Sequence, residues 1–266
     1  MRIEVHCSMD DRLETFRDVR DAVRRVERGQ FLVEGRRNVE VLARQLRFPS
    51  RAVLVTPAAF EAMGETWERL SPSVPIFVGD KRLVNEVVGY DMHRGCLAVA
   101  DRREDVGLAE LLTLGPTLLV AEDLTDIDNV GSLFRNGLAL GADGVLLSPR
   151  CSDPLYRKSV RVSMGAVLRL PYARADAWPG DLVGLRAAGY AIVALDPLED
   201  AEDLDAFADR APERVALVLG SEGGGLSDAV REIADARVGI RMSRGVDSLN
   251  VATAAAVALQ RLGARL

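Results

Sequence analysis

The chain has 266 residues, a length that suits two modest domains or one large one. Its 48% hydrophobic and 28% charged residues are the composition of a globular protein. Its formal net charge of −6 argues against a protein that coats nucleic acid without specificity. No apolar run approaches the roughly 20 residues of a membrane span, and no signal-peptide core follows the early acidic residues, so we expect a cytoplasmic protein.

The first part of the chain predicts a compact α/β module. Leu13, Phe16, Val19 and Val23 recur every three or four residues, which predicts an amphipathic helix. Apolar runs then predict strands at 31–35, 52–55, 74–78 and 96–100. Between them we predict a helix capped by Asn38 that continues to residue 46, a helix that starts at 56–57, and a short helix at 81–88.

A change in composition marks a domain junction near residue 113. The stretch 101–105 is charged and contains no leucine, isoleucine or valine, and a short helix at 108–112 and Gly115-Pro116 follow it. Such polar, turn-rich segments lie between domains. We therefore predict a first domain at 1–113 and a second domain at 114–266.

The second part alternates regularly between short apolar strands and helices. Almost uniformly apolar strands that alternate with helices are typical of a parallel sheet covered on both faces. The predicted strands are 118–121, 144–147, 191–195, 215–219 and 236–240. The predicted helices lie near 130–140, 154–165, 180–188, 202–208, 226–233 and 249–262.

Cysteine and histidine usage gives no sign of a disulfide framework or a transition-metal site. Cys7, Cys96 and Cys151 are far apart and form no paired motif, and the only histidines are His6 and His93. We predict no metal centre, although carboxylate-bound magnesium stays open.

The first of three candidate site segments is 128–135, which follows the strand at 118–121. Asp126 or Asp128 can cap the next helix, whose free N–H groups favour anions. Asn129 and Arg135 then have two interpretations. They are a capping residue and a surface residue, or an arginine that binds a phosphate beside an asparagine that orients a hydroxyl.

The second segment is 219–225, where a strand ends in a glycine-rich turn that contains Glu222. Its spacing fits neither a dinucleotide-binding fingerprint nor a P-loop. Glycines let a backbone turn sharply or approach a ligand closely. A solvated turn and a ligand-binding loop are equally compatible with this segment alone.

The third segment runs from 240–243 to 248–251 and opens the last helix. Asp247 or Ser248 is the expected cap, which explains one polar residue at this helix start but not also Asn250. The helix that follows carries small residues on all sides, so we expect it to be buried or pressed against another backbone. All three segments lie between the end of a predicted strand and the start of the next helix. In a parallel sheet such loops lie at one edge, where they converge on a ligand.

Taken together, these segments resemble the SpoU, or TrmH-like, branch of the SPOUT RNA methyltransferases over residues 117–266. Residues 31–100, with Phe31 to Gly35 and Gly89 to Ala98, resemble the ribosomal-protein L30e-like module that often precedes this catalytic domain and binds its substrate. The resemblance implies an α/β trefoil knot near 215–262, although threaded chains are rare among folds. It also implies a homodimer joined partly through the knot region.

The resemblance further implies S-adenosylmethionine as the cofactor and transfer of its methyl group to a ribose 2′-hydroxyl of RNA, with rRNA favoured over tRNA. The implied cofactor-binding residues are Leu219, Gly220, Ile240, Met242, Ser248, Leu249 and Asn250. The implied catalytic residues are Asn129, Arg135, Glu222, Ser248 and Asn250. A guanidinium stays protonated, so we expect Arg135 to hold a phosphate and stabilise negative charge instead of acting as a base.

Two positions depart from the family pattern, and several basic residues have two interpretations. Ser221 stands where the family often has asparagine, and Arg241 stands where proline is common. Candidate contacts to the RNA backbone are Arg36, Arg37, Arg157 and Arg161, with Lys158 beside the last two; each is otherwise part of a solvated face. The alternatives are a tRNA 2′-O-methyltransferase, an enzyme that methylates a base, and an inactive RNA-binding protein of this fold.

Overall fold

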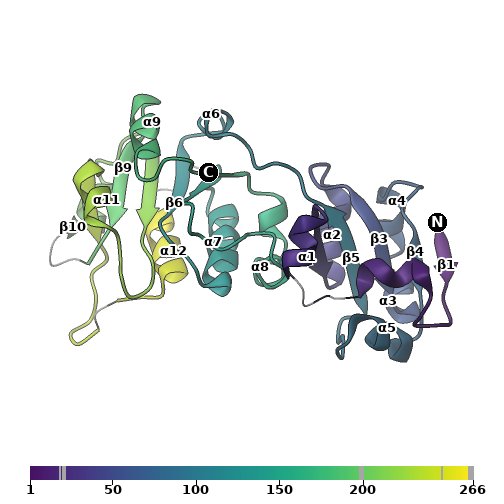
Figure 1. Ribbon diagram of the computed structural model, residues 1–266. Coiled ribbons are helices and arrows are strands. Elements are labelled where there is room, and N and C mark those ends of the chain that lie inside the picture. Colours follow the sequence, from purple (N-terminus) through teal and green to yellow (C-terminus); the bar gives the residue numbers. More distant parts are fainter. Residues whose placement is uncertain (18, 20–21, 198–200, 247, 263–266) are drawn as a thin grey trace. The chain divides into compact units, whose positions relative to one another are not determined.

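A computed structural model describes residues 1–17, 19, 22–197, 201–246 and 248–262 (Figure 1). The chain divides into two compact units. The first contains Met1–Glu104 and Leu155–Leu168, and the second contains Asp105–Pro154 and Arg169–Leu266. Residues 155–168, which the sequence analysis grouped with the C-terminal half, thus pack within the first unit, where α8 (Arg157–Val162) lies against β2 (Gln30–Glu34).

The first unit is built on a five-stranded mixed sheet with the order β1-β4-β3-β5-β2. β1 (Arg2–Glu4), β4 (Ile76–Val78) and β3 (Ser50–Val55) run parallel, and β5 (Cys96–Asp101) is antiparallel to both β3 and β2. Its helices are a 3₁₀ helix (Asp11–Phe16), α1 (Ala22–Glu27), α2 (Arg36–Arg44), α3 (Pro57–Ala62), α4 (Gly64–Arg69), α5 (Lys81–Val88) and α8, which a second 3₁₀ helix (Ala166–Leu168) follows.

Two predictions for this unit were wrong in detail. The single amphipathic helix is a 3₁₀ helix followed by α1, on which Val23 is 69% exposed; residues 18, 20 and 21 of that prediction lie outside the described residues. Asn38 does not cap α2, which begins after Gly35. Asn38 is buried in the first turn of α2, and its Nδ2 donates to the Glu34 carbonyl at 2.9 Å. Its side chain therefore holds the end of β2 instead of capping the helix.

The second unit contains a seven-stranded sheet, and every neighbouring pair in its described part runs parallel. In spatial order the strands are β10 (Glu202–Asp203), β12 (Ala236–Gly239), β9 (Ala191–Leu195), β11 (Val215–Leu219), β6 (Thr117–Ala121), β7 (Gly144–Leu147) and β8 (Tyr172–Arg174). The helices are α6 (Leu108–Leu111), α7 (Ile127–Ala139), α9 (Asp181–Ala187), α10 (Leu204–Ala208), α11 (Asp228–Ile233) and α12 (Val251–Arg261). The prediction of an α/β fold with a parallel sheet is confirmed.

The strand register brings the candidate segments to one edge of the sheet. Leu219, the last residue of β11, pairs with Ala121 of β6 on one side and with Leu195 of β9 on the other. β12 is in turn parallel to β9, with Val238 opposite Leu195. Four strands therefore end at nearly the same level, and the loops that follow them leave from the same edge, where ligands bind in open parallel sheets.

The last helix packs against the helix that carries the first candidate segment. Figure 1 shows α12 (yellow) beside α7 (teal), and Asn136 Nδ2 donates to the Ala252 carbonyl at 2.7 Å. A side chain can reach the backbone of α12 because Ala252, Ala255 and Ala258 on its buried side are small. None of the helices in the described part of the chain has the length and apolar character needed to cross a bilayer.

Candidate active site

Three polar side chains from three distant segments form one hydrogen-bonded cluster. Asn129 Nδ2 donates to Glu222 Oε1 at 2.5 Å, and Asn250 Nδ2 lies 2.8 Å from Asn129 Oδ1 and 3.0 Å from Glu222 Oε1. These residues are up to 121 positions apart in the chain. The two amides therefore hold the same carboxylate oxygen, and Glu222 Oε2 accepts no hydrogen bond from the described residues.

Asn129 reaches the cluster because another residue caps its helix. Asp126 Oδ1 accepts hydrogen bonds from the backbone nitrogens of Asp128 and Asn129, at 2.7 and 3.0 Å. Of the two candidate caps that the sequence left open, Asp126 is therefore the one that caps α7. Asn129 is 6% exposed as a whole residue, and because it is not needed as a cap its amide can bond to Glu222 and Asn250.

Asn250, and not Ser248, is the N-cap of α12. Its Oδ1 accepts from the backbone nitrogens of Ala252 and Thr253, at 3.0 and 3.3 Å. The expectation of a cap at Ser248 was wrong by two residues, and the other candidate, Asp247, lies outside the described residues. An amide carries an acceptor and two donors, so Asn250 caps the helix with its oxygen and reaches Asn129 and Glu222 with its nitrogen.

The glycine-rich loop after β11 is a tight turn that presents Glu222. Gly225 donates its N–H to the Ser221 carbonyl at 3.0 Å. A Cβ atom at Gly220 would collide with the backbone of Gly225 and Leu226, so only glycine fits where the loop crosses itself. Glu222 is exposed at the tip of this turn, which makes its carboxylate accessible.

A cavity of about 890 Å³ opens beside the cluster. The loops after β9, β11 and β12 and the first turn of α12 line it. All seven residues that the resemblance implied for the cofactor are among its lining residues: Leu219, Gly220, Ile240, Met242, Ser248, Leu249 and Asn250. Glu222 also lines this cavity, so two members of the cluster, Glu222 and Asn250, form part of its wall, whereas Asn129 does not line it.

Arg135 stands apart from the cluster within this chain. It follows Asn129 by six residues on α7, about 9 Å along the helix axis, and it does not line the cavity. Its side chain is exposed and makes no hydrogen bond or ion pair with the rest of the described chain. The guanidinium is therefore available to an anion from outside the chain.

The sequence reasoning missed a buried carboxylate in the cavity wall. Asp196 directly follows β9, and its side chain is 1% exposed. Its Oδ2 lies 3.1 Å from Arg231 Nε and 2.9 Å from Arg237 Nε, and the hydrogen bond to Asp196 raises the pKa of Arg231. The signal that could have found Asp196 is its position: a carboxylate immediately after an apolar strand of the parallel sheet.

The unusual arginine at position 241 has a partner in the structure. Arg241 NH2 lies 2.8 Å from Asp203 Oδ2, and Asp203 also caps α10. The ion pair joins the segment after β12 to the short edge strand β10. Arg241 thus ties the cavity loop to its neighbour where the family pattern has a proline.

The basic candidates for RNA contact divide into two groups. Arg157 NH1 lies 2.9 Å from Glu34 Oε2, and Arg161 NH1 lies 3.8 Å from the same oxygen. The Glu34 side chain is 8% exposed. Arg157 also stacks on Tyr90, whose pKa rises to about 12, chiefly because of burial and with the Glu34 charge adding to it. These arginines hold α8 on β2, whereas Arg36 and Arg37 are exposed.

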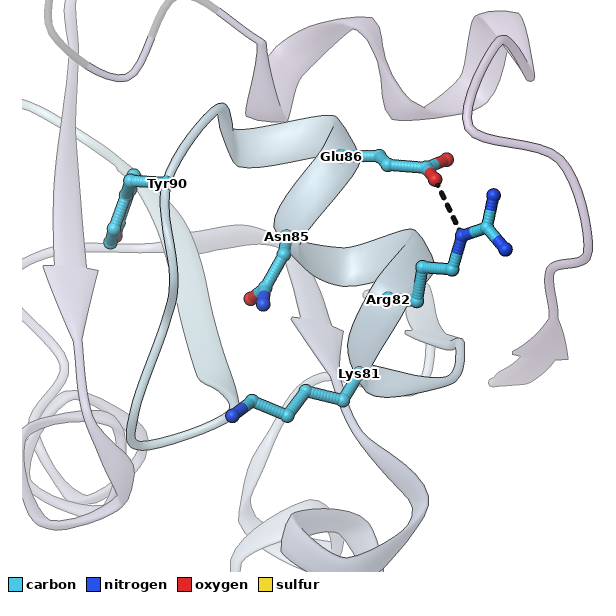
Figure 2. Close-up of a pocket in the computed structure, with 5 residues that line it drawn as sticks. All are labelled: Lys81, Arg82, Asn85, Glu86 and Tyr90. Atoms are coloured by element: carbon cyan, nitrogen blue, oxygen red, sulfur yellow. Dashed lines mark hydrogen bonds and ion pairs between the residues drawn. The ribbon is translucent and has the colours of Figure 1, made fainter.

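A second cavity, of about 600 Å³, lies over α5 in the first unit (Figure 2). The charged side chains that line it form ion pairs: Arg82 Nε is 3.0 Å from Glu86 Oε1, and Lys81 Nζ is 3.3 Å from Asp91 Oδ1. The hydrogen bond from Asn85, and after it Lys81, lower the pKa of Asp91. We therefore assign no ligand to this cavity, which is lined by Lys81, Arg82, Asn85, Glu86 and Tyr90.

Comparison with known proteins agrees with this geometry. Residues 116–260 match the model of the SpoU rRNA Methylase family. Over 260 residues the chain is 40% identical to an uncharacterized tRNA/rRNA methyltransferase of Mycobacterium tuberculosis, an alignment that covers 95% of this chain and 88% of the relative. A parallel-sheet α/β RNA methyltransferase is thus the class that the fold and site define. The chain belongs to the SpoU rRNA Methylase family, which confirms the resemblance to the SpoU/TrmH-like branch.

Solved structures extend the similarity over both units. The SpoU methyltransferase AviRb from Streptomyces viridochromogenes, in complex with AdoMet, is 26% identical with a TM-score of 0.76, and the match covers 94% of this chain and 95% of that one. An AdoMet-bound rRNA methyltransferase from Sinorhizobium meliloti has the same fold, with 24% identity, a TM-score of 0.81, and coverage of 98% and 97%.

Proposed function

We propose that this RNA methyltransferase transfers a methyl group from S-adenosylmethionine to a ribose 2′-hydroxyl of RNA, with rRNA as its substrate. The observation that carries the proposal is the hydrogen-bonded cluster in which Asn129 holds Glu222 and Asn250, two residues that line the cavity. The AdoMet complex of AviRb and the tRNA/rRNA name of the mycobacterial relative support it.

The cavity suits the cofactor in size and in chemistry. Its volume of about 890 Å³ falls within the range of roughly 300–1,000 Å³ for small-molecule sites. The glycine turn gives close access to backbone groups at Gly220, and the segments at Ile240 and Leu249 provide the other walls. When bound there, S-adenosylmethionine supplies a methyl group activated by its sulfonium.

The polar cluster would place the ribose of the substrate. Asn129 and Asn250 hold Oε1 of Glu222, which leaves Oε2 as an acceptor for a hydroxyl group. Ser248 lies two residues before Asn250 and also lines the cavity, so it adds a further donor or acceptor. These residues orient the nucleophile, and orientation contributes much of the rate in a group transfer.

Arg135 would act on the charge that develops during the reaction. The 2′-oxygen would form a bond to the methyl carbon and lose its proton, while the bond from that carbon to the sulfonium sulfur breaks and S-adenosylhomocysteine leaves. Because the guanidinium stays protonated, Arg135 cannot take that proton. We assign it to hold the neighbouring phosphate and to stabilise negative charge on the oxygen, while a phosphate oxygen accepts the proton.

The remaining family features belong to the same proposal. We propose that the chain is threaded into a knot near 215–262 and that two copies pair through this region. The separation of Arg135 from its own cavity fits an arrangement in which the site is completed by the partner subunit. The first unit would act as an L30e-like RNA-binding module, with Arg36 and Arg37 as backbone contacts.

Two measurements test the proposal. Titration calorimetry with S-adenosylhomocysteine should detect binding by the isolated protein, and its absence would contradict the cofactor site. Mass analysis of nucleosides from rRNA and tRNA treated with the protein should show 2′-O-methylated ribose in rRNA. A methylated base, or product in tRNA alone, would replace the proposed target; binding without any product would indicate an inactive RNA-binding protein.

A further inference from the structure

A second buried carboxylate lies beneath the glycine loop and takes no part in the proposed chemistry. Glu122 directly follows β6 and is 3% exposed. Its Oε1 accepts from Trp178 Nε1 at 2.8 Å and from Ser227 Oγ at 2.7 Å, and its Oε2 accepts from the Ser227 backbone nitrogen at 2.8 Å. The indole N–H of Trp178 and the backbone N–H of Ser227 can only donate, so the Glu122 carboxylate is surrounded by donors that require an acceptor.

These hydrogen bonds connect the two ends of the glycine loop. Ser227 ends the loop and caps α11, since its Oγ accepts from the Val230 nitrogen. Leu219 begins the loop, and its carbonyl accepts from the Glu122 backbone nitrogen at 2.8 Å. Glu122 thus binds the loop at its entry through the main chain and at its exit through the side chain.

The same residue also borders the segment that carries Asn129. Glu122 lies four positions before Asp126, the cap of α7, and Asn129 follows in the first turn of that helix. Glu222, at the tip of the glycine loop, bonds to Asn129 across the site. The hydrogen bonds of Glu122 and the hydrogen bond between Glu222 and Asn129 therefore connect the same two segments, the one that follows β6 and the glycine loop.

We propose that Glu122 is a positioning residue for cofactor binding, which it promotes by holding Ser227 and thereby the glycine loop that lines the cavity. This inference rests on the proposed cofactor site. Glu122 itself does not line the cavity, so it acts through the loop and not by contact.

The substitution Glu122→Gln isolates this role. The carboxamide has nearly the same shape, but only one of its two terminal atoms accepts hydrogen bonds. If the carboxamide oxygen serves Trp178 and Ser227 Oγ, its NH₂ group faces the Ser227 N–H, and a buried donor loses its partner. The exit of the loop is then released while the cavity wall keeps its composition.

The test compares the affinity for S-adenosylhomocysteine of four folded variants by calorimetry. Glu122→Gln should raise the Kd about tenfold, which is about 1.4 kcal/mol. Ser227→Ala should raise it by a smaller factor. Because both act through one link, the double variant should bind no more weakly than Glu122→Gln alone. Glu232→Gln, on the exposed surface of α11, should bind like the wild type.

A general loss of stability would lower the melting temperature of the variants without changing the Kd of the folded fraction at 25 °C. An unchanged Kd in folded Glu122→Gln, or additive effects in the double variant, would overturn the inference. If Glu122→Gln does not fold, Ser227→Ala decides: wild-type affinity there overturns it, and weakened affinity supports it. Failure of the wild type to bind S-adenosylhomocysteine would instead contradict the proposed cofactor site.

Discussion

Two places in the molecule, the ion pairs around Glu34 and Glu86 in the first unit and the candidate site in the second, use their polar side chains in opposite ways. In the first unit, charged groups neutralise one another: Glu34 holds Arg157 and Arg161, and Glu86 holds Arg82. At the sheet edge of the second unit, Arg135 has no partner in the described chain, and Glu222 keeps one oxygen without a hydrogen bond. The same residue types thus contribute mainly to stability in these ion pairs of the first unit and remain available to a ligand at the candidate site of the second.

If this contrast is correct, removing the unpaired arginine should affect catalysis and little else. We expect Arg135→Ala to lower kcat by about 100- to 1,000-fold, because it removes stabilisation of developing charge. Its Kd for S-adenosylhomocysteine and its melting temperature should stay near those of the wild type. Multiple-turnover methylation of rRNA measures kcat, titration calorimetry measures the Kd, and thermal denaturation measures the melting temperature. Turnover close to wild type with RNA bound would remove Arg135 from the mechanism.

The glycine turn offers a sharper test of the second unit. We expect Gly220→Ala to weaken S-adenosylhomocysteine binding by about 10- to 100-fold, since the added methyl group meets backbone that cannot move aside cheaply. Gly224→Ala is the matched control in the same loop, because its Cβ would meet only the Ser221 hydroxyl. Equal affinities of the two variants would show that the loop does not shape the cofactor site.

Variants in the first unit test whether its ion pairs serve stability and not ligand binding. Glu34→Gln should lower the free energy of unfolding by about 1–2 kcal/mol, because two arginines lose a buried charged acceptor. The matched control, Glu86→Gln, breaks an exposed pair and should cost less than about 0.5 kcal/mol. Chemical denaturation measures both variants. The idea fails if Glu34→Gln changes S-adenosylhomocysteine affinity but not stability.

Asn250 both caps α12 and bonds to Glu222, and we expect its loss to cost no more stability than Glu34→Gln. Asn250→Ala should lower the free energy of unfolding by about 1 kcal/mol through loss of the α12 cap. Asn250→Asp keeps the oxygen that caps α12, but it removes the amide donor and places a second carboxylate beside Glu222, so it should reduce turnover. Equal turnover of Asn250→Asp and the wild type would contradict a role for the cluster in catalysis.

Local sequence was sufficient to predict the strands that consist almost entirely of apolar residues. The apolar runs at 144–147, 191–195 and 215–219 form strands with those same bounds, because burial on both faces selects β-branched and aliphatic residues. The short strands β8 and β10 were not predicted. β10 consists of Glu202 and Asp203 alone, whose side chains carry no apolar signal.

What the sequence by itself determined was the parallel sheet, the order of its loops and the residue types that line the cavity. Only the tertiary structure decided that Asn250 caps α12 while bonding to Glu222, that Arg157 is held by Glu34, and that Glu122 lies under the glycine loop. Periodicity reports which face of an element is apolar, a property of neighbouring residues. The partner of a polar group depends on segments that are up to 123 residues away along the chain, and only the folded chain brings them within hydrogen-bond distance.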